Sequence, residues 1–294
     1  MKILFATDGS EHSESAARFI SSFKFSEKDE IEILHAISWL PVMREWESLA
    51  EDFRTIREEV VPKILTSASD ILIPTTADIC TSYTEDFPDK AIIDAAESSG
   101  ADLIVMGARG LRGLATHIVG SVTKTVAAKA HTPVLIVKSR KQGLTGKVKI
   151  LFATDGSKYS DATANILTSI PFPDNTDLTI LNVSFSSLYD IPDQLSMEID
   201  SRIKNIIAGT HEEASRISDE ITGKTYELLK DRFANSARIT RFGDPAEEIL
   251  SIAEDTGADI IALGSSGKRG ILKTLGSVSR YVLNHANCSV LIGK

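Results

Sequence analysis

The sequence predicts an α/β protein built from two copies of one domain, each with a parallel sheet covered by helices on both faces. Two observations lead to this prediction. Short apolar runs of strand length alternate with segments of helical period, which is typical of a parallel sheet between two helix layers. The string Lys2–Ser10 also returns letter for letter as Lys149–Ser157, and 294 residues suffice for two domains that each bury a core.

Five strands are expected in the first half, each an apolar run bounded by turn residues: 2–7, 31–37, 77–82, 103–106 and 134–137. Helices are expected at 42–67, 89–98 and 121–130, and another after the turn that begins at Asp8. Ser10 or Ser13 can cap that first helix, with Asp8 as a rival cap. The apolar face of the 42–67 helix is expected to hold Trp46, Leu49, Phe53, Ile56, Val60 and Ile64.

The second half repeats this order with one insertion. Asp177–Val183 follows Glu30–Ala36 at an offset of 147 residues, whereas Gly257–Ile261 follows Gly100–Ile104 at an offset of 157. The ten extra residues fall in a helical segment at 197–233, whose apolar stripe runs through Ile199, Ile203, Ile206, Ala214, Ile217, Ile221 and Leu228. Core packing is the first interpretation of this stripe, and an exposed face that binds a partner is the second.

A polar linker with two glycines, residues 139–147, joins the two copies. Polar segments of this kind are where domain boundaries fall. We therefore predict a first domain at 1–140 and a second domain at 141–294.

The composition is that of an ordinary globular protein, and it excludes several classes of function. The net charge of −9 is shared between the halves, and neither half is basic enough for sequence-independent binding of nucleic acid. No window approaches the roughly 18 apolar residues of a membrane span, and Asp8 interrupts the first apolar run too early for an export signal. Cys80 and Cys288 lack metal-ligand spacing, so reduced thiols in a cytoplasm are the simplest interpretation, with a bridge between them left open.

The feature that points to function is a glycine-rich loop between the fourth strand and the next helix. Gly107 and Gly110 follow the strand directly, where backbone N–H groups can turn inward around an anion. Gly120 stands at the helix start, where N–H groups without helical partners and the helix dipole favour a phosphate. Hydroxyl donors and positive charge are available from neighbouring residues: Ser121, Thr123, Arg109 and Arg112.

Asp8 ends the first strand and is expected to project into the same crevice, because ligands of open parallel sheets bind beyond the carboxyl ends of the strands. Its carboxylate can accept hydrogen bonds from ribose hydroxyls or from a base amine. The alternative is purely structural, with Asp8 as a helix cap and the glycines as a tight connection. Duplication of the whole set favours the nucleotide interpretation.

Other nucleotide-binding and metal-binding motifs are absent from the sequence. No Gly-x-Gly-x-x-Gly follows the first strand, which argues against a dinucleotide fold of the usual kind. No Gly-x-x-x-x-Gly-Lys-Ser/Thr occurs either, which removes the Walker-type NTPase interpretation. The six histidines do not pair at ligand spacing, so no metal site is predicted from side chains.

The spacing Gly107-x2-Gly110-x9-Gly120-Ser121, together with Ala6–Ser10 and Leu34–Ala36, resembles the ATP-binding form of the universal stress protein family, here as a tandem. The resemblance covers essentially both repeats. It implies a Rossmann-like (adenine nucleotide alpha hydrolase-like) fold, with a five-stranded parallel sheet flanked by helices in each domain. It also implies an adenine near Asp8, Ala36 and Met106. The phosphates would be held by Gly107, Gly110, Gly120, Ser121 and Thr123, and Arg109 and Val122 are counted among the nucleotide-binding residues of the same site.

The corresponding set in the second repeat is Asp155, Val183, Leu263, Gly264, Gly267, Gly276, Ser277 and Ser279. Eight residues separate Gly267 from Gly276, whereas the family pattern has nine, so the second loop is shorter by one residue. We therefore expect the first site to be the better ATP site. Basic residues in the second loop can offset part of the difference with charge: Lys268, Arg269 and Lys273.

These residues predict a cytoplasmic ATP-binding protein, with or without Mg²⁺, in which nucleotide occupancy controls conformation or the choice of an unidentified protein partner. Two alternatives stay open. One is a slow Mg²⁺-dependent ATP hydrolase, for which the sequence nominates no catalytic residue. The other is a nucleotide-independent scaffold that uses the long helix of the second repeat. Since members of the resembled family commonly dimerise through their last strands, the resemblance implies that 134–137 pairs with 290–292 within the chain. A homodimer is a further option.

Overall fold

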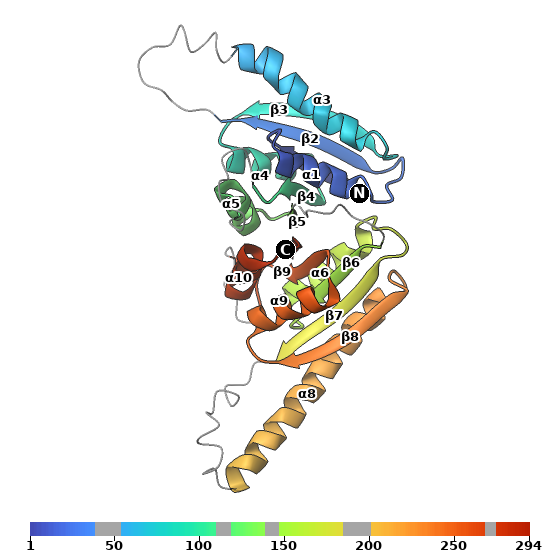
Figure 1. The fold of residues 1–294 in the computed structure, drawn as a ribbon, viewed down its shortest axis with the longest axis vertical. Helices are drawn as coiled ribbons and strands as arrows, with labels where there is room; N and C mark the ends of the chain where they lie inside the picture. The colour runs from blue at the N-terminus through green and yellow to red at the C-terminus, as the bar shows by residue number, and fades with distance from the viewer. Residues whose placement is uncertain (39–53, 110–118, 139–146, 185–200, 268–274) are drawn as a thin grey trace, which may run out of the picture.

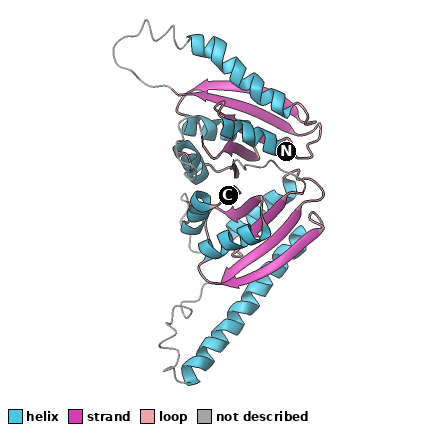
Figure 2. Cartoon of the chain, viewed as in Figure 1, coloured by secondary structure: helices cyan, strands magenta, loops and turns pink. Residues whose placement is uncertain are grey.

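The structure is a computed structural model, and it describes residues 1–38, 54–109, 119–138, 147–184, 201–267 and 275–294. Its strands form one continuous sheet with helices on both faces (Figure 1, Figure 2). The α/β class and the duplicated, helix-flanked parallel architecture predicted from the sequence are confirmed.

The elements of the first copy lie close to their predicted positions. In chain order they are β1 (Lys2–Thr7), α1 (Glu11–Ile20), β2 (Glu30–Ile37), the π-helical turn η1 (Ile56–Val60), α3 (Val61–Leu72), β3 (Asp78–Glu85), α4 (Pro88–Ser99), β4 (Leu103–Gly107), α5 (Ser121–Lys129) and β5 (Val134–Val137). β3 ends at Glu85 rather than at 82, and α3 ends at Leu72 rather than at 67. The predicted helical residues 42–53 lie outside the described residues.

The second copy repeats the order of the first. Its elements are β6 (Lys149–Ala153), α6 (Lys158–Ser169), β7 (Asp177–Ser184), α8 (Ser201–Leu229), β8 (Asn235–Phe242), α9 (Pro245–Thr256), β9 (Ile260–Gly264), α10 (Ser277–His285) and β10 (Ser289–Gly293). α8 is the 29-residue helix that contains most of the predicted 197–233 segment, and its first turns extend beyond the sheet in Figure 1.

The described strands form a ten-stranded sheet in the order β3-β2-β1-β4-β5-β10-β9-β6-β7-β8. Every pair within a copy is parallel. At the centre β5 and β10 pair in antiparallel register, with Leu135 opposite Leu291. The pairing of the last strands within the chain, which the family resemblance implied, is therefore present in the structure.

Each face of the sheet carries one hydrophobic core that continues across both copies. α1, α3, α6 and α8 cover one face, and α4, α5, α9 and α10 cover the other. On the first face the ring of Phe23 packs edge-on against the ring of Phe172, with 5.1 Å between centroids. Next to this pair the backbone N–H of Lys24 donates to the carbonyl oxygen of Pro171 at 2.7 Å. The two copies thus share buried contacts as well as a sheet.

The predicted apolar face of the helix before β3 is wrong at Ile56 and Val60, whereas Ile64 is half-buried and the other predicted face residues lie outside the described residues. Ile56 and Val60 are exposed, and the buried face consists of Val61, Leu65, Ala68 and Leu72. Residues 56–60 form the π-helical turn η1, in which more than 3.6 residues complete each turn. The 3.6-residue spacing of apolar residues, if it is extended through this turn, therefore predicts the wrong face of α3.

The predicted core stripe of α8 is wrong at two of the four positions whose burial the structure describes, whereas Ala214 and Ile221 are half-buried. Ile217 and Leu228 are exposed, whereas Ser218, Thr222, Thr225 and Leu229 are buried. The hydroxyls of Thr222 and Thr225 donate at 2.9 Å to carbonyl oxygens one turn earlier in their own helix. Since these donors are already paired, the side chains bury as small apolar groups do. A scale that counts threonine as polar misses this face.

Several other predictions concern the chain as a whole. The domain boundary at 140/141 falls outside the described residues and stays a prediction. Cys80 lies in β3 and Cys288 directly precedes β10, and no disulfide joins these two residues. Within the described ranges, none of the helices is long and apolar enough to span a membrane.

Two adjacent leucines test the corrected face of α8. Replacing Leu229, which is 0% exposed, with alanine should lower the free energy of unfolding by about 2–5 kcal/mol, because it leaves a cavity in the core. Replacing Leu228, which is 47% exposed, should change it by less than about 0.5 kcal/mol. Urea denaturation followed by circular dichroism measures both variants. Equal losses would contradict this assignment of the faces.

Candidate functional site

The carboxyl ends of neighbouring parallel strands bring the predicted residues together in each copy. Because β2, β1 and β4 are adjacent, Ala36, Asp8 and Met106 stand at one edge of the sheet. The order β7-β6-β9 does the same for the second set: Val183, Asp155 and Leu263. The strand order reverses at β1 and at β6, and such switch points are where ligands bind in open parallel sheets.

Each of the two aspartates is held by the turn that follows its strand. Asp8 Oδ1 accepts hydrogen bonds from the N–H and the hydroxyl of Ser10, at 3.1 and 2.6 Å. Ser10 caps α1 by accepting from the N–H of Ser13 at 3.3 Å. In the second copy Asp155 Oδ1 accepts from the N–H of Ser157 at 3.0 Å, and Ser157 caps α6. The rival role of Asp8 as the cap of α1 is therefore wrong.

The starts of α5 and α10 differ from those of the capped helices. Their N-cap residues are Gly120 and Gly276, both in extended backbone, and no side chain of the described residues caps either helix. By contrast, Ser10, Ser157 and Asp244 cap α1, α6 and α9 through their side chains. The first-turn N–H groups of an α-helix have no helical acceptor, and together with the helix dipole they favour an anion. The starts of α5 and α10 are thus suited to phosphate.

The two buried hydroxyls predicted to meet phosphate have other partners. Thr123 Oγ1 donates to the carbonyl oxygen of Gly107 at 3.1 Å, and Ser279 Oγ donates to that of Gly264 at 2.7 Å. These bonds tie each helix start to the end of the preceding strand. Ser121, which is exposed at the first helical position, has its hydroxyl at the surface, and its counterpart Ser277 is exposed in the same way.

The glycine at each strand end is explained by packing. A Cβ on Gly107 would lie 2.8 Å from the backbone carbonyl carbon of His12, in the first turn of α1. A Cβ on Gly264 would lie 2.9 Å from the corresponding backbone atom of Tyr159. Backbone atoms cannot move aside as a flexible side chain can, so only glycine fits at these positions. Packing therefore accounts for these two glycines, and the part of their backbone in a phosphate cradle stays a prediction.

A cavity of about 360 Å³ lies at the carboxyl ends of the parallel strands of the second copy. Its lining includes every residue that the sequence predicted for that site: Asp155, Val183, Leu263, Gly264, Gly267, Gly276, Ser277 and Ser279. The sequence did not nominate Pro245 and Ile249 of α9, which also line it. A cavity of this size, with apolar walls and a few polar groups, is typical of small-molecule sites.

The first copy has the same arrangement as far as the structure describes it. Val122 is half-buried at the start of α5 and packs against the core, and Arg109 is half-buried after β4. Gly110 and Arg112 lie outside the described residues, as do three basic residues of the second loop: Lys268, Arg269 and Lys273. The expected difference between the two sites therefore stays a prediction.

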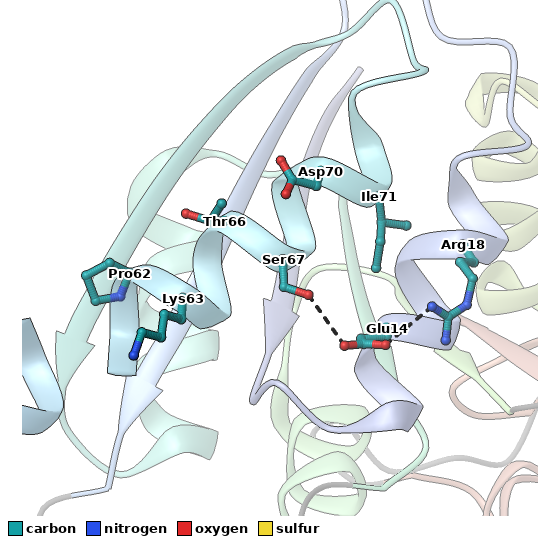
Figure 3. A pocket seen from close by; sticks show the side chains of 8 residues that line it. All are labelled: Glu14, Arg18, Pro62, Lys63, Thr66, Ser67, Asp70 and Ile71. Carbon is teal, nitrogen blue, oxygen red and sulfur yellow. Dashed lines mark hydrogen bonds and ion pairs between the residues drawn. The ribbon is translucent and has the colours of Figure 1, made fainter. Parts of the chain in front are cut away.

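A second concavity lies away from these sites, between α1 and α3, with a volume of about 600 Å³. As Figure 3 shows, Glu14 accepts hydrogen bonds from Ser67 at 3.4 Å and from Arg18 at 3.3 Å. Lys63 and Asp70 also line it, so its basic and acidic side chains balance. None of the predicted site residues lines this groove.

Comparison with known proteins decides the family. The model of the universal stress protein family matches this chain twice, over residues 1–138 and 148–294. The chain belongs to the universal stress protein family. The two matches agree with the tandem arrangement of the fold, since each covers one of the two copies.

Individual relatives agree with this assignment. Universal stress protein MJ0531 of Methanocaldococcus jannaschii is 32% identical over 146 residues, which cover 48% of this chain and 84% of the relative. A universal stress protein of Mycolicibacterium smegmatis is 24% identical over an alignment that covers 99% of this chain and 96% of the relative. The crystal structure of a universal stress protein from Archaeoglobus fulgidus covers 100% of this chain and 98% of its own, with a TM-score of 0.66 and 21% identity. This last likeness supports the fold.

Substitutions at two glycines of this universal stress protein test whether glycine is required for close packing, as at Gly107, or only occupies an N-cap position, as at Gly120. Gly107→Ala should lower the free energy of unfolding by about 1–3 kcal/mol, because the added methyl group meets the backbone of α1. Gly120→Ala is the matched control, since its Cβ would meet nothing closer than 3.6 Å and its φ is −62°. Thermal and urea unfolding measure both variants. Destabilisation by Gly120→Ala as large as that by Gly107→Ala would contradict this distinction.

Proposed function

We propose that this universal stress protein binds ATP at the carboxyl edge of its sheet. In the second domain the phosphates lie at the start of α10, and in the first domain they lie at the start of α5. The observation that carries the proposal is the cavity of the second domain, which the residues predicted from the sequence line together. The uncapped helix at one side of that cavity supplies N–H donors to the phosphates.

The two ends of the cavity suit the two ends of the nucleotide. Asp155 Oδ2 lies beside the loop, where a Cβ on Gly267 would come within 2.9 Å of it. From there the carboxylate can accept hydrogen bonds from ribose hydroxyls or from the amine of adenine. Val183 and Leu263 offer apolar contact to the base, while exposed Ser277 offers a hydroxyl to a phosphate. In the first domain the same roles fall to Asp8, Ala36, Met106 and Ser121.

Nucleotide occupancy would control conformation or the choice of a protein partner, and a cytoplasmic location also stays a prediction. The described residues contain no group of three histidine, cysteine, aspartate or glutamate side chains that could hold a metal ion. We therefore assign Mg²⁺ to no side chain, and no residue is assigned to ATP hydrolysis. The exposed Ile217 and Leu228 of α8 are compatible with a partner-binding surface on that helix.

Titration of the purified chain with ATP by calorimetry tests the proposal. The wild type should bind ATP, and Gly276→Val should remove the second-domain site, because a bulky side chain would crowd the start of α10, where a Cβ already lies 3.4 Å from backbone atoms of Ser265 and Ser266. The number of ATP molecules bound per chain should then fall by one if both sites fill. Gly120→Val should have the same effect on the first site.

Gly209→Ala serves as the control, because a Cβ on this helical glycine would meet nothing within 4 Å. It should leave ATP binding unchanged. Absence of binding by the wild type at millimolar ATP, or full binding by the double variant Gly120→Val/Gly276→Val, would overturn the proposal.

A further inference from the structure

Two lysines link the domains on the face that carries α5 and α10. Lys138 directly follows β5, and its Nζ donates to the carbonyl oxygens of Leu283 and Ala286 at 2.7 and 2.6 Å. Lys294 directly follows β10, and its Nζ donates to the carbonyl oxygen of Ala127 at 2.6 Å. Each lysine therefore reaches from the central strand of one domain to the end of a helix in the other.

The two contacts are equivalent. Lys294 follows Lys138 by 156 residues, and Leu283 follows Ala127 by the same 156 residues. Gly264 follows Gly107 by 157 residues, one more than this offset. The difference arises because the second glycine loop is one residue shorter than the first. The Lys138–Leu283 contact is thus made again by Lys294 and Ala127, in the opposite direction across the β5–β10 pair, while the bond of Lys138 to Ala286 is additional.

The helices that receive these lysines are the two that begin at the candidate phosphate sites. α5 and α10 are each nine residues long, so about 13 Å separates the N–H groups of the first turn from the carbonyls of the last. The last-turn carbonyls of an α-helix have no helical donor, and a cation there interacts favourably with the helix dipole. Burial lowers the pKa of Lys138 and of Lys294 to about 8, so both remain largely protonated at neutral pH.

We propose that Lys138 and Lys294 are positioning residues, each of which holds the phosphate-binding helix of the opposite domain in place. This inference rests on the proposed function. Lys138 fixes the carboxyl end of α10 and thereby the direction of the N–H groups at Gly276 and Ser277. Lys294 does the same for α5 and the site at Gly120. A short helix behaves as a rigid rod, so an end fixed by a buried bond limits the tilt of the other end.

The same segments also contact the loops of their own domains. The carbonyl oxygen of Val137 accepts from the N–H of Ala108 at 2.9 Å, and that of Gly293 accepts from the N–H of Ser265 at 2.8 Å. One end of β5 therefore touches the loop of the first site, while the next residue, Lys138, holds the helix of the second.

A crossed set of variants tests the proposal. Gly120→Val leaves the second site as the ATP site, and Gly276→Val leaves the first. In the Gly120→Val background, Lys138→Met should raise the dissociation constant for ATP by about two- to tenfold, because the bond to α10 is lost while the apolar stem is kept. In the Gly276→Val background, Lys294→Met should do the same. Each substitution should change the site of its own domain less.

Lys138→Arg restores a cation with several donors and should recover most of the affinity. If Lys138→Met fails to fold, the Lys294→Met arm and the arginine variant still decide the question. Equal weakening at both sites, together with a lower unfolding temperature, would show a merely structural role and overturn the positioning role. Unchanged affinities would overturn it as well. If the wild type binds no ATP, the proposed function itself fails, which the wild-type titration shows before any lysine is changed.

Discussion

The antiparallel pairing of β5 with β10 is the contact on which the rest of the molecule depends. It places Leu135 opposite Leu291, both fully buried, and it makes the core on each face continuous across the two domains. Because successive side chains of a strand point to opposite faces, a shift of one residue in this register would turn the central leucines out of their core. The same shift would carry Lys138 and Lys294 away from the helix ends that they reach.

Packing at the strand ends arranges the candidate sites in advance of any ligand. Gly107 lets the first turn of α1 approach β4, and the hydroxyl of Thr123 ties the start of α5 to the same strand. Gly264 and Ser279 repeat both contacts in the second domain. Each helix start is therefore held in position, and any ligand that binds there would lose little free energy to ordering these contacts.

The strands and the duplication could be predicted because an apolar run between turn residues has few alternatives, and β1 and β5 have the predicted bounds. The helix faces could not. Thr222 is buried although it counts as polar, since its hydroxyl bonds to its own helix. The residues predicted for the second site line one cavity together, but the partner of Ser279 could not be predicted, because it depends on packing. Lys138 was missed although the repeat of Val134–Lys138 in Val290–Lys294 was visible, since nothing local shows which helix a lysine reaches.

Pairing β5 with β10 within one chain also limits how two chains can associate. A strand has two hydrogen-bonding edges, and β5 uses its edges for β4 and β10, while β10 uses its edges for β9 and β5. The last strands are therefore occupied, and a second copy cannot pair with them while this register holds. In the described sheet the strands with an open edge are β3 and β8, one at each end. If two chains pair through strands of the described sheet, they have to use one of these open edges, because the tandem makes within one chain the contact that the family resemblance implied between the last strands.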